Sequence, residues 1–316
     1  MSSTRVAAVD CGTNSIRLLV ADVAPDGTLV ELDRRMEIVR LGQGVDRTGE
    51  LAPEALERTL AATREYAKVA GDLGATKVRF VATSATRDAR NRDVFVAGVR
   101  AALGVEPEVV SGQEEALLSF RGATSGAASA HPGPYLVVDL GGGSTELVLG
   151  TSSPEAALST DVGSVRLTER HLHSDPPTAA EVAAARADVD AALDAAAPVV
   201  PWGRTATLVG LAGSVTSVTA HALGLPTYQR DRVNGTVLTV SDTLAACDDL
   251  LSRTRAQRLD LGFMHPGRAD VIGAGALVWA RVVERVRDDV AAAGGALTHV
   301  VTSESDILDG IALSLA

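Results

Sequence analysis

The chain has 316 residues, of which 46% are hydrophobic, so it is long enough for about two domains with sizeable cores. A net charge of −11 argues against a general nucleic-acid binder, but it permits an anionic substrate that a local positive field holds. No apolar run is long enough to span a bilayer, and the first residues lack the basic start and apolar core of a signal peptide. Because Cys11 and Cys247 are the only cysteines, we expect a cytoplasmic protein with no disulfide framework. The charge and the lack of an apolar span lead us to expect neither a nucleic-acid nor a membrane partner.

The first half of the chain predicts a meander of three antiparallel strands, followed by helices that alternate with strands. The turn at residues 25–27 separates two of these strands, and Pro53 opens a stretch with helical periodicity. Ser111 and Glu114 have the spacing of a capping box, and Asn91 is placed to cap an earlier helix. The first expected strand ends at residue 10, and further strands are expected at 15–23, 28–36, 77–83 and 106–110. The expected helices cover 53–73, 91–103 and 111–123.

The second half repeats this order after residues 124–134, a small, polar and breaker-rich stretch that marks the best domain boundary. Thr178 and Glu181 have a second capping-box spacing, and Ser241 is placed to cap a further helix. Strands that alternate with helices after each meander indicate an α/β fold, in which helices cover mixed sheets. The expected strands cover 135–139, 145–150, 156–161, 206–212, 237–240 and 297–302, and the expected helices begin at 178 and 213 and cover 269–293 and 306–315.

One stretch of the second meander, residues 136–146, has the composition of a phosphate-binding turn. A β-branched run ends in Asp139, three consecutive glycines follow, and a strand resumes after Glu146. Glycines let a ligand approach the backbone, and successive N–H groups in such a turn form a concave anion site. Asp139 and Glu146 would repel a phosphate unless a hard cation bridges them, which favours Mg²⁺, with Mn²⁺ as the alternative. A glycine-rich hairpin without a ligand is the competing interpretation.

The first meander contains a second copy of this pattern at residues 6–20. There an apolar run ends at Asp10, a turn of small residues with hydroxyl groups follows, and a strand returns. Two similar hairpins, one near the start and one near the middle of the chain, indicate a duplicated domain with a cleft between the copies.

With four further motifs, the two hairpins resemble those of the exopolyphosphatase / guanosine pentaphosphate phosphohydrolase (Ppx/GppA phosphatase) family. That family belongs to the actin-like ATPase and sugar-kinase superfamily. The matching stretches are distributed over nearly the whole chain, at residues 10–17, 82–91, 111–116, 139–146, 163–166 and 211–214.

The resemblance implies two ribonuclease-H-like domains, each a mixed five-stranded sheet with flanking helices, and an active site in the cleft between them. The expected domains are residues 1–124, completed by a C-terminal helix at 304–316, and residues 125–303. The implied activity is Mg²⁺-dependent hydrolysis of the terminal phosphoanhydride of inorganic polyphosphate, with release of orthophosphate. Because the chain ends soon after its closing helix and lacks the helical C-terminal region of long family members, short polyphosphates are the expected substrates. A homodimer is the expected assembly.

Three other functions stay open at this point. The main substrate is alternatively guanosine pentaphosphate (pppGpp), and nothing in the residues separates the two substrates. A kinase of the same superfamily is a second alternative, although the Ser-Gly-Gln-Glu-Glu stretch at 111–115 favours a water nucleophile over an acceptor alcohol. A non-catalytic sensor of the alarmone or of polyphosphate is the third, and the presence of Glu115 argues for turnover instead.

The expected phosphate ligands are backbone N–H and hydroxyl groups of the two turns, together with arginines that bind two phosphate oxygens at once. Asp139 and Glu146 are the expected metal ligands, and Asp10 either joins them or braces its own turn. The competing interpretation of these arginines is that they form surface ion pairs. The turn at 213–214 matches the turn that lies on the nucleoside side of the site in the superfamily. The phosphate-binding candidates are Thr13, Asn14, Ser15, Arg17, Arg87, Gly141, Gly142, Gly143, Ser144, Arg166 and Arg268, of which the last two are also candidates for contact with a guanosine.

The candidate general base is one of two consecutive glutamates at the start of the helix expected over 111–123. A base must direct a water molecule at phosphorus. Glu114 lies at the position that completes the helix cap, whereas Glu115 is turned about 100° further around the helix and has no such role. The family match also favours Glu115, with Glu114 as the second candidate. The competing interpretation of Glu115 is an exposed first-turn carboxylate that the helix dipole favours.

Overall fold

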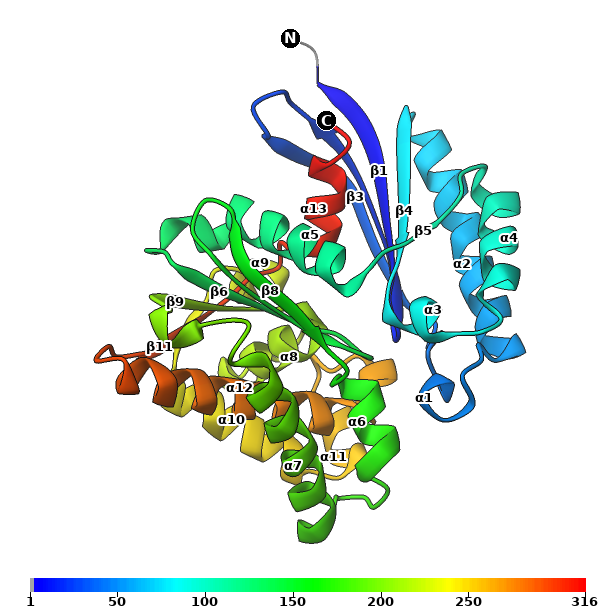
Figure 1. Cartoon of the computed structure of the whole chain (residues 1–316). Helices are drawn as coiled ribbons and strands as arrows, with labels where there is room; N and C mark the ends of the chain where they lie inside the picture. Colours follow the sequence, from blue (N-terminus) through cyan, green and yellow to red (C-terminus); the bar gives the residue numbers. More distant parts are fainter. Residues whose placement is uncertain (1–2) are drawn as a thin grey trace. The chain divides into compact units, whose positions relative to one another are not determined.

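The structure, a computed structural model, describes residues 3–316 of the chain (Figure 1). The chain forms two compact units: unit 1 comprises residues up to Gly122 together with Ile307–Ala316, and unit 2 comprises Ala123–Asp306. Each unit is built around one mixed β-sheet with flanking helices, so the predicted α/β class is confirmed. Among the described residues, no helix combines the length and the apolar character needed to cross a membrane.

Unit 1 contains the five-stranded mixed sheet that the sequence predicts. The strand order is β3-β2-β1-β4-β5, in which β1 pairs antiparallel with β2 and parallel with β4. Short turns join the first three strands and force antiparallel pairing, whereas β4 and β5 follow helical connections. The strands are β1 (Thr4–Cys11), β2 (Ser15–Val23), β3 (Leu29–Ile38), β4 (Lys77–Ala82) and β5 (Glu108–Val109).

Helices cover both faces of this sheet, because alternate residues of its central strand are apolar on both sides. On β1, Ala7 and Val9 pack into one core, while Val6 and Ala8 pack into another that contains residues of the C-terminal helix α13. Asn91 precedes α4, but its side chain bonds the backbone of Leu51 instead of capping the helix. The helices are α1 (Val45–Thr48), α2 (Pro53–Asp72), α3 (Ser84–Asp88), α4 (Arg92–Leu103), α5 (Gly112–Ser125, which continues into unit 2) and α13 (Ile307–Leu313).

Unit 2 has a six-stranded sheet, and the expectation of five strands is wrong for this unit. The order is β10-β11-β9-β6-β7-β8, in which the additional strand β10 pairs antiparallel with β11 at the edge. Just before this short strand, the N–H of Gly235 donates to the carbonyl of Thr302, and the N–H of Thr302 donates to the carbonyl of Thr236, which brings the strand alongside β11. The strands are β6 (Tyr135–Leu140), β7 (Thr145–Gly150), β8 (Pro154–Thr160), β9 (Thr207–Leu211), β10 (Val237–Thr239) and β11 (His299–Thr302).

The helices of unit 2 pack mainly around α12, which contacts α6, α7, α8 and α10. The capping box of Thr178 and Glu181 is present at the start of α7, as predicted. The N-cap of α10 is Thr239, whose hydroxyl accepts from the N–H of Asp242, so the predicted cap at Ser241 is wrong by two residues. The helices are α6 (Ser164–His171), α7 (Ala179–Ala196), α8 (Ala212–Ala222), α9 (Arg230–Val233), α10 (Val240–Ser252), α11 (Arg255–Leu259) and α12 (Ile272–Ala292), with 3₁₀ turns at Ala127–Ala130, Trp202–Arg204 and Pro266–Arg268.

Candidate active site

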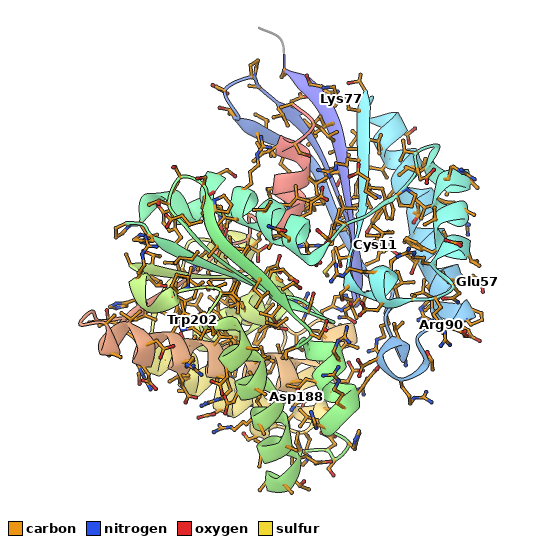
Figure 2. The ribbon with its side chains drawn as sticks, viewed as in Figure 1. Cys11, Glu57, Lys77, Arg90, Asp188 and Trp202 are labelled. Carbon is orange, nitrogen blue, oxygen red and sulfur yellow. The ribbon has the colours of Figure 1, made fainter. Side chains whose placement is uncertain are left out.

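The turn between β1 and β2, in unit 1, follows Cys11, which is labelled in Figure 2. The N–H of Gly12 donates to the carbonyl of Ser15 at 2.9 Å, and the carbonyl of Asn14 accepts from the backbone of the loop after β3. The hydroxyl of Thr13 lies 2.9 Å from that of Ser84, on α3. Within residues 3–316, the N–H groups of Thr13 and Asn14 donate to no protein acceptor. The turn therefore presents two backbone donors that are available to an anion.

The turn between β6 and β7, in unit 2, has the same form. The N–H of Gly141 donates to the carbonyl of Ser144 at 3.0 Å, and the described part of the chain provides no acceptor for the N–H groups of Gly142 and Gly143. Ser144 itself is 2% exposed. The predicted glycine-rich turn thus also presents backbone donors without protein acceptors.

Residues of helix α6 donate hydrogen bonds to the carbonyl groups of this second turn. The N–H groups of Ser164 and Val165 donate to the carbonyls of Gly141 and Gly142 at 3.0 and 2.8 Å. Nε of Arg166 donates to the carbonyl of Gly143 at 2.7 Å. The carbonyl groups of Gly141, Gly142 and Gly143 thus accept from residues of α6, whereas the N–H groups of Gly142 and Gly143 do not bond to this helix. The sequence did not predict α6, and Arg166 acts in the structure as a brace for the glycine turn.

Two carboxylates lie opposite one another beside the second turn. Asp139 on β6 pairs with Glu146 on β7, and they are 6% and 1% exposed. The hydroxyl of Ser159, on β8, donates to Oε1 of Glu146 at 2.7 Å, a contact that the sequence pattern did not signal. Like charges directly opposite each other on paired strands destabilise the sheet, and a bound cation would offset that cost. Among the described residues, no group of three or more His, Cys, Asp or Glu side chains is placed to hold a metal ion. A cation beside Asp139 and Glu146 would therefore take its other ligands from phosphate and water, as Mg²⁺ commonly does.

Asp10 has a different partner at the corresponding place in unit 1. It pairs across the strands with Arg17, whose Nη2 lies 2.6 Å from Oδ2 of Asp10. Asp10 is 4% exposed, so this is a largely buried ion pair.

Cys11, next to Asp10, is not suited to nucleophilic attack. Burial of the thiol and, to a smaller extent, the charge of Asp10 raise the pKa of Cys11 well above its usual value, which keeps the thiol protonated.

The two consecutive glutamates of α5 have separate environments. Glu115 is 7% exposed, and its Oε2 accepts from Nη1 of Arg87 at 3.0 Å. The same nitrogen donates to the carbonyl of Val110 at 3.0 Å. Glu114 lies on the surface, where its Oε1 accepts from Nη2 of Arg79 at 2.7 Å. Glu115 is therefore a buried carboxylate held by Arg87, not an exposed first-turn carboxylate.

Arg268 lies over the start of helix α8. Its Nη1 donates to the hydroxyl of Ser217 at 3.1 Å, and its guanidinium packs so closely on Gly213 that a Cβ at position 213 would overlap it.

The predicted site residues are divided between the two units. Unit 1 holds Asp10, the turn at 13–17, Arg87 and Glu115, while unit 2 holds the stretch 139–146, Arg166 and Arg268.

Comparison with known proteins shows what this chain resembles as a whole. The Ppx/GppA phosphatase family matches over residues 19–304. Exopolyphosphatase 2 of Mycobacterium tuberculosis is 50% identical over 324 aligned positions, which cover 100% of both chains. A guanosine-5'-triphosphate,3'-diphosphate pyrophosphatase of Photobacterium profundum is 31% identical over 309 positions, which cover 94% of this chain and 58% of that protein.

Solved structures give the same result. The crystal structure of an exopolyphosphatase-like protein superposes with a TM-score of 0.97 at 48% identity and covers 100% of this chain and 98% of the other. The Ppx/GppA family member of Aquifex aeolicus superposes with a TM-score of 0.78 at 28% identity, with 99% and 97% coverage. The resemblance drawn from the motifs is confirmed, and the chain belongs to the Ppx/GppA phosphatase family.

Proposed function

We propose that the protein is an exopolyphosphatase, which hydrolyses the terminal phosphoanhydride of inorganic polyphosphate and releases orthophosphate. The observation that carries the proposal is the pair of turns, each with two backbone N–H donors that no acceptor among residues 3–316 uses, in a chain that also holds the buried carboxylate of Glu115. Such donors suit the equatorial oxygens of a phosphoryl group. The relative named exopolyphosphatase 2 supports polyphosphate as the substrate.

In this proposal, Glu115 accepts a proton from the water molecule that attacks the terminal phosphorus. Arg87 fixes one oxygen of that carboxylate through Nη1 and thereby orients the base. The N–H groups of Gly142 and Gly143, and those of Thr13 and Asn14, would hold phosphoryl oxygens whose charge must be stabilised during transfer. We further propose that each turn binds a phosphate group, with Arg17 in unit 1 and Arg268 in unit 2 as additional phosphate contacts.

Asp139 and Glu146 are the proposed holders of a divalent cation. Two buried carboxylates on opposite strands fit the donor set of Mg²⁺, and Mn²⁺ is the alternative. The bound cation would neutralise charge on the phosphate oxygens. Asp10, by contrast, is engaged by Arg17, so we assign it to bracing the first turn.

The substrate is tested by measuring orthophosphate release from polyphosphates of several lengths and from guanosine pentaphosphate. We expect a higher kcat/KM for a polyphosphate. A value at least tenfold higher for guanosine pentaphosphate would favour the second candidate, which the relative from Photobacterium profundum supports. Tight binding of either compound without any phosphate release would favour a sensor.

The role of Glu115 is tested by Glu115→Gln. This change removes the base but keeps the shape of the side chain, so kcat should fall by about 10²- to 10⁴-fold. Polyphosphate binding, measured by calorimetry, should stay within a few-fold of the unmodified protein. The comparison variant is Glu114→Gln, which alters the exposed neighbour paired with Arg79. If Glu114→Gln loses turnover and Glu115→Gln keeps it, the assignment of the base is reversed.

A further inference from the structure

The two turns have the same backbone plan, and each is held through its carbonyl groups. In both turns, the N–H of the first residue donates to the carbonyl of the fourth. Thr13 and Asn14, the second and third residues of the first turn, therefore correspond to Gly142 and Gly143. Helix α6 bonds the carbonyls of the turn in unit 2, whereas a different segment does so in unit 1.

In unit 1 that segment is the loop at residues 39–42, between β3 and the short helix α1, which lies beside α3 (Figure 1). The N–H of Gly42 donates to the carbonyl of Thr13 at 2.8 Å. The N–H groups of Val39 and Arg40 both donate to the carbonyl of Asn14, at 3.1 and 2.9 Å. Arg40 has a φ of 52°, which is rare for a residue other than glycine, and strain of this kind is retained where the surrounding contacts fix a functional segment.

Gly42 packs against Thr13 so closely that no side chain fits at position 42. A Cβ there would lie 2.3 Å from Cγ2 of Thr13 and 3.0 Å from Cβ of Ala85, on α3. The φ of Gly42 lies outside the left-handed region, so these neighbours exclude a Cβ and backbone strain does not. Thr13 cannot easily turn away, because its hydroxyl lies 2.9 Å from that of Ser84 and a β-branched side chain has few rotamers.

Unit 2 has the same close approach at the corresponding position. There a Cβ on Gly163, the residue before α6, would lie 2.5 Å from the carbonyl oxygen of Gly142. A glycine thus packs on the second residue of each turn, although a loop provides it in unit 1 and the start of a helix provides it in unit 2. The two segments differ in conformation, and what they share is contact with the residue whose N–H is presented to an anion.

We infer that Gly42 is a positioning residue, which lets the loop at 39–42 hold the first turn so that the N–H groups of Thr13 and Asn14 face a phosphoryl group. The inference rests on the proposed function and adds the residue that sets the geometry of the first turn. A methyl group at position 42 must displace Thr13, because the surrounding atoms are closely packed. Misplacing a binding group by about 1 Å lowers the rate by up to about 10²-fold.

The test measures Gly42→Ala in two ways. The first is kcat/KM for orthophosphate release from tripolyphosphate with Mg²⁺ present. The second is the affinity for tripolyphosphate, measured by calorimetry with Glu115→Gln in both proteins so that turnover does not disturb the titration. We expect Gly42→Ala to lower both quantities at least tenfold at temperatures well below its melting temperature.

A second substitution separates displacement of the turn from a general loss of stability. Thr13→Ser removes the methyl group that the new Cβ would strike but keeps the hydroxyl that contacts Ser84. The remaining neighbours of the Cβ, at 3.0 Å and beyond, then need to give by only a few tenths of an ångström. In the Thr13→Ser background, Gly42→Ala should therefore change kcat/KM and affinity by less than about threefold.

The matched control for an overlap elsewhere in unit 1 is Gly98→Ala. Gly98 lies on α4, and its Cβ would lie 2.6 Å from Cδ1 of Leu60, on α2. This variant disturbs the packing of two helices but neither turn, so kcat/KM should stay within about twofold of the unmodified protein even if the melting temperature falls.

Three results would overturn the inference: full activity and affinity in Gly42→Ala, an equal loss in the Thr13→Ser background, or the same loss in Gly98→Ala. If Gly42→Ala does not fold, the double variant with Thr13→Ser decides, and a tenfold deficit relative to Thr13→Ser alone contradicts the inference. Affinities that change as expected, in a protein that releases no phosphate, would support the role of Gly42 and remove the proposed hydrolysis. An unmodified protein that does not bind tripolyphosphate would remove both.

Discussion

At the residue scale, Arg258 shows how a buried charge stabilises unit 2. This arginine is 4% exposed, and it donates from Nε to the carbonyl of Leu250 and from Nη2 to that of Leu251, at 2.8 and 3.0 Å. Its Nη1 donates to the carbonyl of Ala269 at 3.3 Å. The last carbonyls of helix α10 have no partner within the helix, and one planar guanidinium satisfies two of them together with a loop carbonyl. Burial lowers the pKa of Arg258, although an arginine keeps its charge.

Replacing this residue should cost considerable stability. In Arg258→Met the apolar stem is kept but three carbonyls lose their donor, at about 1–3 kcal/mol for each buried group. We expect the free energy of unfolding of unit 2 to fall by about 3 kcal/mol or more in urea titrations. Arg255, like Arg258, lies on helix α11, but it is exposed. Arg255→Met is therefore the matched control, and its free energy of unfolding should stay within about 0.5 kcal/mol of that of the unmodified protein. Equal losses in the two variants would contradict the role given to the guanidinium.

At the element scale, the first turn of α6 determines where the glycine turn lies. The residue before this helix, Gly163, packs against the backbone of Gly142, and a Cβ at 163 would lie 2.5 Å from the carbonyl oxygen of Gly142. Because the obstacle is backbone, an added methyl group must displace the turn. The N–H groups of Gly142 and Gly143 would then move from the positions that suit a phosphate.

We therefore expect Gly163→Ala to lower kcat/KM for phosphate release at least tenfold, while the melting temperature changes by only a few degrees. The control is Gly71→Ala in helix α2, where nothing lies within 4 Å of the new Cβ and activity should be unchanged. A Gly163→Ala variant with full activity would show that the position of the turn does not limit catalysis.

The capping box of α7 makes a pH-dependent contribution to stability. The N–H of Thr178 donates to Glu181, and this bond is the first cause that lowers the pKa of Glu181 to about 2 from its ordinary 4.5. A carboxyl group with a lowered pKa in the folded state stabilises the fold above its unfolded pKa, and this effect is lost as the pH falls from 4.5 towards 2. The melting temperature of Glu181→Gln should lie below that of the unmodified protein at pH 7, and the gap should narrow below about pH 4. A gap that is the same at both pH values would rule out this linkage.

At the scale of the whole molecule, one supersecondary plan is used twice. The order β3-β2-β1-β4-β5 in unit 1 corresponds to β8-β7-β6-β9-β11 in unit 2, and β10 is an addition at the second edge. The repeated plan explains why two stretches far apart in the sequence present the same backbone donors. The expected domain limits, 1–124 with 304–316 for one domain and 125–303 for the other, stay a prediction. The expected cleft between these ribonuclease-H-like domains also stays a prediction.

The proposed metal dependence applies to the activity of the whole protein. Treatment with EDTA should reduce phosphate release to background, and added Mg²⁺ or Mn²⁺ should restore it. The circular dichroism spectrum should not change, because Asp139 and Glu146 lie in strands whose backbone pairing is complete without a metal. Undiminished phosphate release after removal of the metal would contradict the assignment.

The sequence by itself determined the strands and long helices to within a few residues, such as Ser15–Val23 and the helix that begins at Pro53. It also determined the family, because motifs, apolar periodicity and turn residues are local properties of the chain. The short helices α1, α3, α6, α9 and α11 and the true partners of Asn91 were not predicted, because these depend on competing contacts with distant residues.

Within the candidate site, the sequence determined which residue types were present but not what each one contacts. Only the tertiary structure decided that Arg17 neutralises Asp10, that Arg87 holds Glu115 and that Arg166 bonds the glycine turn. Strand register and helix packing bring these groups together from separate parts of the chain. A local pattern carries no information about such distances, which explains why the residue types of the candidate site could be listed from the sequence and the contacts of the individual arginines could not.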